Sequence, residues 1–177
     1  MSDFLRNIVR LAVFIGIQVY LLNKIPHLHQ FIIPYIYFLF VLWLPFRISR
    51  ISLMFVAFIT GIILDSFTNT PGLHAAACVL IAYLRPFVIG VLTPKDSTEF
   101  NYREPSPRAM GWTPYLVYVL VLTLFHHGYM TLLEWFSFGG FLRFLIKVAS
   151  TTAISMLLII IIELLFPRKL KFRTNTA

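Results

Sequence analysis

The chain has 177 residues, of which 59% are hydrophobic and only 12% are charged. A soluble domain of this length could not bury so much apolar surface, so the composition excludes a soluble catalytic domain and indicates a polytopic membrane protein. The formal charge of +8 comes from short basic clusters beside apolar runs rather than from one basic face, which favours orientation in a membrane over nucleic-acid binding.

Runs of about 20 largely apolar residues, the length of a helix that crosses a bilayer, define the predicted elements in chain order. The fold is predicted to be all-α, with six transmembrane helices bundled in residues 1–166. The spans lie near residues 6–25, 30–46, 50–68, 72–93, 113–136 and 141–166. The second span is short and contains Pro34, and the fourth contains Pro86, so both are expected to bend locally.

The segments outside the spans predict the orientation of the chain. Residues 94–112 form the one sizeable loop, and residues 167–177 form a basic tail. With six spans both chain ends share a side, and that side collects most of the 15 Lys and Arg residues. Because basic residues concentrate in cytoplasmic loops, both termini, the loop and the tail are predicted to be cytoplasmic.

Several ionisable side chains fall inside the predicted spans or at their ends. A helical rise of about 1.5 Å per residue places one set of them together in the outer half of the membrane. The set comprises Asp65, His74, His126, His127, Glu134, Arg143 and Lys147. A charge in hydrocarbon costs at least about 2.5 kcal/mol, so such groups usually face the bundle interior and pair with one another. The sequence predicts either structural pairs or an outward-opening polar pocket.

The pairing within this set is left open by the sequence. Arg143 is the candidate partner of Glu134, and Arg6 or Arg10 is the candidate partner of Glu163 on the cytoplasmic side. For Asp65 the candidates are the side chains at similar depth, namely His74, His126 and Lys147.

Small residues recur at helical spacing between positions 61 and 82, and they are predicted to pack helices closely. They are Gly61, Gly72, Ala76, Cys78 and Ala82. Gly61 precedes Asp65 by one helical turn. The sequence TNTPG, which follows Asp65 closely, has Pro-Gly turn chemistry and predicts a tight hairpin that holds Asp65 near His74.

No motif of an enzyme is present. His127 and Glu134 share a helical face, but the metalloprotease pattern H-E-x-x-H is absent. The chain also lacks a Gly-rich phosphate loop, a G-x-S-x-G elbow and a Cys-His constellation. The sequence therefore predicts no enzymatic activity, no cofactor and no metal site.

The stretch GIILDSFTNTPGLHAAACVLIAYL, together with six predicted spans in so short a chain, resembles the rod shape-determining MreD family. That family shows Gly-x-x-x-Asp at the end of its third span and Gly-Leu-His at the start of its fourth. The matching residues are Gly61, Asp65, Gly72, Leu73 and His74. The turn FTNTPG departs from the more glycine- or serine-rich turn of the family.

The resemblance implies a non-enzymatic scaffold of the cell-elongation machinery in the bacterial inner membrane, which helps to organise lateral peptidoglycan synthesis. The implied partners are MreC first, then MreB filaments, the RodA glycosyltransferase, its class B penicillin-binding transpeptidase and membrane lipid. It also implies a likeness to the S-components of energy-coupling-factor transporters, six-helix bundles with an outward-facing pocket. A small-molecule-binding transport subunit is therefore the alternative function.

Overall fold

The computed structural model describes residues 3–24, 34–93, 104–134 and 140–168. These residues form helices and no strand, as the predicted all-α class requires. Two of the helices are single turns, α2 (Leu39–Leu42) and α5 (Pro107–Met110). The long elements are α1 (Asp3–Gly16) with its continuations η1 (Ile17–Leu21) and η2 (Leu22–Lys24), α3 (Arg50–Thr68), α4 (Leu73–Leu92), α6 (Trp112–Glu134) and α7 (Phe141–Leu165).

Five helical stretches of the described chain are long and apolar enough to cross a membrane. They are Leu5–Lys24, Arg50–Thr68, Leu73–Leu92, Trp112–Glu134 and Phe141–Leu165. Their outward faces carry large apolar side chains such as Ile51, which is 83% exposed. Because lipid, unlike water, accommodates such faces, the chain is a multi-pass membrane protein.

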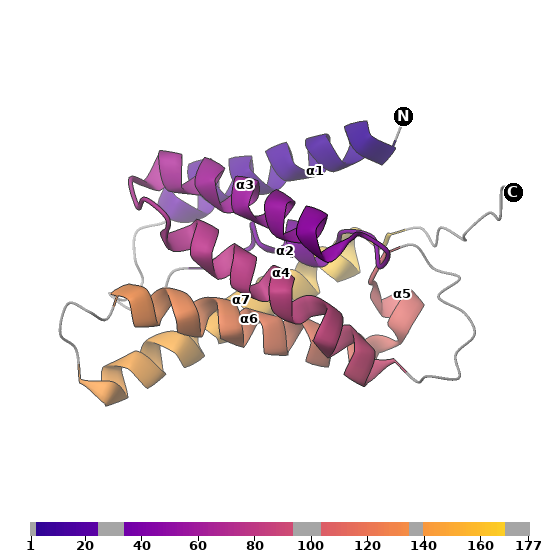
Figure 1. The fold of residues 1–177 in the computed structure, drawn as a ribbon. Coiled ribbons are helices and arrows are strands. Elements are labelled where there is room, and N and C mark those ends of the chain that lie inside the picture. The colour runs from indigo at the N-terminus through magenta and orange to yellow at the C-terminus, as the bar shows by residue number, and fades with distance from the viewer. Residues whose placement is uncertain (1–2, 25–33, 94–103, 135–139, 169–177) are drawn as a thin grey trace, which may run out of the picture.

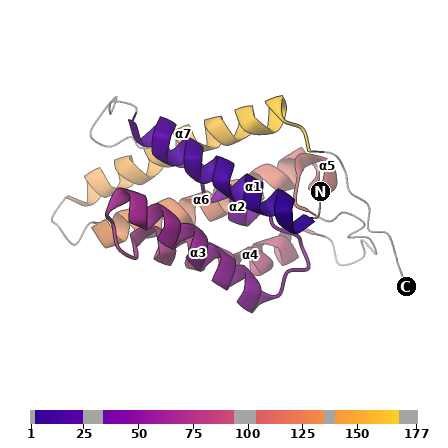
Figure 2. The ribbon, with the colours of Figure 1, turned by 90° about the horizontal axis from the view of Figure 1, so that it is seen from above.

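The long helices lie side by side in one bundle (Figures 1 and 2). The first turn of α1 and the last turn of α7 lie at the same end of this bundle, which we call the terminal end. The opposite end, which contains the turn between α3 and α4, is called the turn end. The described chain therefore begins and finishes at one end of the bundle.

The predicted spanning helix over residues 30–46 is wrong for the described residues. Between Pro34 and Leu44 the chain forms the single-turn helix α2 and tight turns, in which the amide of Leu39 bonds the carbonyl of Ile36 at 3.0 Å. Proline lacks an amide hydrogen and restricts the residue before it, so Pro34 and Pro45 limit the helix at both ends. This stretch, which we call the central segment (residues 34–44), is almost entirely buried among the long helices. Residues 30–33 lie outside the described chain.

Side chains satisfy the backbone at the start of the central segment. Gln18, which is fully buried in η1, donates to the carbonyl of Pro34 at 3.1 Å and accepts from the amide of Ile36 at 2.9 Å. The hydroxyl of Ser155 in α7 accepts from the amide of Tyr35 at 3.0 Å. Irregular backbone at membrane depth is tolerated only where the protein supplies such partners.

Arg85 and Tyr118 satisfy the backbone at the other end of the central segment. Arg85, on α4, is 1% exposed; it donates to the carbonyl of Leu44 and, at 3.4 Å, to that of Pro45. Its Nε donates to the hydroxyl of Tyr118 at 2.9 Å, and that hydroxyl donates to the carbonyl of Leu42 at 2.8 Å. Helices α4 and α6 are thereby fastened to the central segment.

Replacing Arg85 with methionine is expected to lower the free energy of unfolding by about 3 kcal/mol, because buried carbonyl groups lose their donors. The same change at Arg47, which is exposed, is the matched control and should have little effect. Thermal unfolding in mild detergent measures both. Equal midpoints for the two variants would show that Arg85 does not hold the central segment.

Candidate functional site

Asp65, in the last turns of α3, accepts the hydrogen bonds that hold the turn end together. Its Oδ1 accepts hydrogen bonds from the amide and Nδ1 of His74, at 3.0 and 3.1 Å, and from the hydroxyl of Thr70 at 3.1 Å. Its Oδ2 accepts from the amides of Gly72 and Ala75, both at 3.1 Å. The carboxylate therefore caps the first turn of α4, where Gly72 at the N-cap has no side chain to do so. The helix dipole favours a negative charge at this position.

Gly61 allows the close contact on which this cap depends. A Cβ atom on Gly61 would lie 2.3 Å from the Cα and 2.4 Å from the amide nitrogen of Ala75. No side chain fits there, so the backbones of α3 and α4 approach each other directly. Asp65 follows one turn later, on the same side of α3. We call Gly61, Asp65, His74 and Ala75 the hairpin clasp.

The other predicted packing residues divide into two groups. Cys78 and Ala82 are buried, as residues that pack helices are. Gly72 is not at a close helix contact, since a Cβ there would meet nothing within 4 Å; its φ of 83° instead provides the left-handed backbone of the turn. Ala76 is half-buried and, with Gly72, lines a groove on the outer surface of the bundle.

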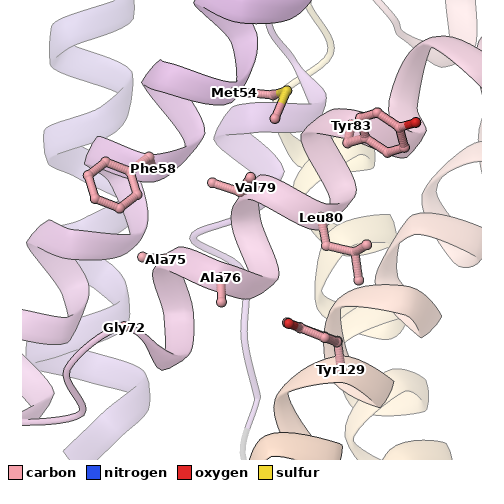
Figure 3. Close-up of a pocket in the computed structure, with 9 residues that line it drawn as sticks. All are labelled: Met54, Phe58, Gly72, Ala75, Ala76, Val79, Leu80, Tyr83 and Tyr129. Atoms are coloured by element: carbon pink, nitrogen blue, oxygen red, sulfur yellow. The ribbon is translucent and has the colours of Figure 1, made fainter.

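This groove has a volume of about 500 Å³ and lies along α4, with side chains from α3 and α6 at its edges (Figure 3). Apart from the glycine and alanines of α4, it is lined by Met54, Phe58, Val79, Leu80, Tyr83 and Tyr129. Phe58 and Tyr83 are exposed, so the groove opens toward the lipid. The small residues of α4 therefore have two roles. Ala75 allows the close contact with Gly61, and the small side chains also leave room for the open groove.

The three histidines of the predicted cluster come together around the central segment. Nε2 of His126 lies 2.8 Å from the hydroxyl of Tyr37, and the ring of His74 lies 5.4 Å from the Tyr37 ring. The rings of His126 and His127 are 5.2 Å apart, and the Tyr35 ring lies 5.7 Å from that of His127. These rings pack in van der Waals contact and fill the middle of the bundle.

One nitrogen of each histidine, Nε2 of His74, Nδ1 of His126 and Nε2 of His127, has no hydrogen-bond partner in the described part of the chain. The carboxylate of Asp65 accepts hydrogen bonds, so the proton of neutral His74 resides on Nδ1. The described residues hold no group of three or more His, Cys, Asp or Glu side chains placed to bind a metal ion.

The remaining members of the predicted cluster form a separate site. Lys147 of α7 pairs with Glu134 at the end of α6, whereas the sequence offered Lys147 as a partner of Asp65 and Arg143 as the partner of Glu134. Arg143 is exposed in the first turn of α7. The structure thus selects His74 as the ionisable partner of Asp65 and gives Lys147 to Glu134.

At the terminal end, the expected pairing of Glu163 with Arg6 or Arg10 is replaced by other contacts. Glu163 accepts from Nη2 of Arg168 at 2.7 Å and from the hydroxyl of Tyr115. Arg6 and Arg10 each bond Glu104 at 2.8 Å. The sequence could not place residue 104, in the predicted loop, against α1.

Sequence reasoning also missed several polar residues that hold the bundle together. Gln18 and Arg85 give little sign of their role, because each lies alone in an apolar run, and Ser155 is one of several small hydroxyl residues in its span. The residues on α6 do carry a signal, since buried polar side chains recur along one side of it. They are Tyr115, Tyr118, Thr123, His126, His127 and Thr131.

The polar residues of the turn end and of the bundle interior make contacts that join helices. Five hydrogen-bond donors already occupy the carboxylate of Asp65, and the histidines pack against tyrosines.

Comparisons of the chain with protein-family models, curated proteins and solved structures found no match.

Replacing Gly61 with alanine is expected to cost about 1–3 kcal/mol of stability, because the new methyl group forces α3 and α4 apart. The control is Gly128→Ala in α6, where a Cβ meets nothing within 4 Å. Gly128→Ala should be neutral or stabilising, since alanine favours the helix. Unfolding midpoints in detergent compare the two, and a neutral Gly61→Ala would contradict the close contact.

Replacing Asp65 with alanine is expected to cost about 3–5 kcal/mol, because the buried donors of His74 and Thr70 lose their acceptor and the cap of α4 is lost with it. Glu163→Ala should cost less, because Glu163 accepts hydrogen bonds from the side chains of Arg168 and Tyr115, whereas Asp65 accepts five and caps α4. Asp65→Asn, which keeps the shape and one acceptor oxygen, should fall between wild type and Asp65→Ala. The same unfolding assay ranks the three variants, and the reverse order would refute this account of Asp65.

Proposed function

We propose that this chain is a non-enzymatic membrane scaffold of the bacterial cell-elongation machinery, the role that its resemblance to the MreD family implies. In this proposal the protein lies in the inner membrane with both termini cytoplasmic. The chain crosses six times, as in the S-component-like architecture, with the central segment as the short second crossing between α1 and α3.

The observation that carries the proposal is the hairpin clasp. Gly61, Asp65, Gly72 and His74, four of the residues that resemble the family pattern, all serve to join α3 and α4. A motif whose carboxylate is fully occupied by structural hydrogen bonds supports a protein that presents a defined surface, and it offers no free base or nucleophile for catalysis.

The packing of the histidines favours the scaffold over a solute-binding transport subunit. A ligand site needs a cavity with convergent polar groups. Here Phe38 stacks on His126 with ring centroids 4.5 Å apart, and Tyr35 and Tyr37 occupy the rest of the space. The protein's own rings fill the position at which an S-component-like pocket is expected.

The distribution of exposed basic residues supports the proposed orientation. Arg47, Arg50 and Arg108 are exposed just before α3, at its start and in α5, near the terminal end, where Arg6, Arg10 and Arg168 also lie (Figure 1). Near the turn end, the exposed basic residues of the described chain are Lys24 and Arg143. The positive-inside rule assigns the end with the excess of basic residues to the cytoplasm. MreC, a protein with a single span, is the first proposed partner; MreB, RodA and the class B penicillin-binding transpeptidase follow through the complex.

Co-expression of the tagged chain with the MreC-family protein of the same organism is expected to recover both proteins after purification in mild detergent. Gly61→Ala should lower the yield of the partner several-fold, because the hairpin no longer holds its shape. Gly128→Ala should leave the yield unchanged.

Depletion of the chain in its own host is the test in cells, and loss of rod shape is the expected result. Unchanged cell width together with no recovery of the MreC-family protein would eliminate the proposed function. Stoichiometric recovery of a small molecule with the purified chain would support the transport subunit instead.

A further inference from the structure

An arginine cluster surrounds Trp43 at the terminal end. The guanidinium carbon of Arg168 lies 3.9 Å from the centre of the Trp43 ring, and that of Arg10 lies 5.8 Å from it. Glu163 pairs with Arg168, and Glu104 pairs with Arg10 and Arg6. The cluster therefore gathers three guanidinium groups and two carboxylates around one indole, and it carries a net positive charge.

The guanidinium of Arg168 has two nitrogens whose N–H donors are unused by the described residues. Its side chain is only 9% exposed, and Nη2 makes its hydrogen bonds to Glu163 and, at 3.3 Å, to the Tyr115 hydroxyl. Its Nε and Nη1 have no hydrogen-bond partner in the described chain. A buried N–H group without an acceptor is costly, so these two donors mark a position where an acceptor would bind favourably.

The position of the cluster indicates the acceptor. Arg6 and Arg10 lie in the first turns of the α1 span, and Arg168 lies just beyond the end of α7, so the cluster is at the level of the lipid headgroups. The Arg10 side chain is 21% exposed and gives the cluster an accessible edge. Guanidinium groups bind phosphate in two-pronged fashion, which a single ammonium does not.

We propose that the arginine cluster binds the phosphate group of an anionic lipid, held between Arg10 and Arg168 beside Trp43. The inference does not depend on the proposed scaffold function. It assigns the terminal end a specific lipid site, in addition to the general attraction of basic residues for an anionic membrane surface.

The test measures thermal unfolding of the full chain in dodecylmaltoside micelles, which carry no phosphate group, with and without added phosphatidylglycerol. The anionic lipid is expected to raise the wild-type midpoint by about 3 °C or more, since a ligand that binds only the folded state stabilises it. Arg168→Lys should lose most of this shift, because lysine still pairs with Glu163 but lacks the guanidinium donors. Arg47→Lys, the same change at an exposed arginine, should keep the shift.

Inorganic phosphate added to the same dodecylmaltoside micelles distinguishes the source of the phosphate group and is expected to give no shift. An equal shift with inorganic phosphate would overturn the lipid as the ligand. A full shift in Arg168→Lys, or none in the wild-type chain, would overturn the site. Because each variant is compared with itself in the detergent alone, a change in its basal stability does not obscure the result.

Discussion

The constraint on which the structure depends is the need to satisfy the irregular backbone of the central segment inside a membrane bundle. No water reaches this depth, so each amide and carbonyl must find a partner in the protein. Gln18 and Ser155 supply partners at its start, and Arg85 and Tyr118 supply them at its end. These side chains come from η1, α7, α4 and α6, so one buried stretch fixes the positions of the surrounding helices.

Polar contacts carry so much of this fold because lipid provides little hydrophobic drive for helices to associate. At the turn end, the hairpin clasp combines a direct backbone contact at Gly61 with five hydrogen bonds to Asp65. At the terminal end, Glu104 joins the segment before α5 to Arg6 and Arg10 of α1, and Glu163 of α7 pairs with Arg168. Between the two ends, the histidines and tyrosines form an aromatic core. The result is a bundle whose helices are joined by polar or aromatic contacts at both ends and in the middle.

The two ends of the bundle differ in a way that bears on function. The carboxylate of Asp65 is enclosed and saturated, whereas the guanidinium of Arg168 has unused donors beside a partly exposed arginine. The turn end is therefore a closed structural element. The terminal end has N–H donors of Arg168 that can bind a ligand at the membrane surface.

The sequence by itself determined the all-helical class, the membrane environment, the positions of the five long helices and the proximity of Asp65 to His74. Each of these follows from local information, namely the length of apolar runs and a short turn. It was wrong about residues 34–46, the described part of the predicted second span, because apolar composition alone does not distinguish a spanning helix from a buried irregular stretch.

Only the tertiary structure decided which polar groups meet. Glu104 reaches Arg10 across 94 residues of sequence, and Arg85 reaches the carbonyl of Leu44 across 41. Such pairs depend on how the helices are arranged around the central segment, and no local pattern records that arrangement. The physical reason is that a buried polar group takes whichever partner the packing brings within hydrogen-bonding distance.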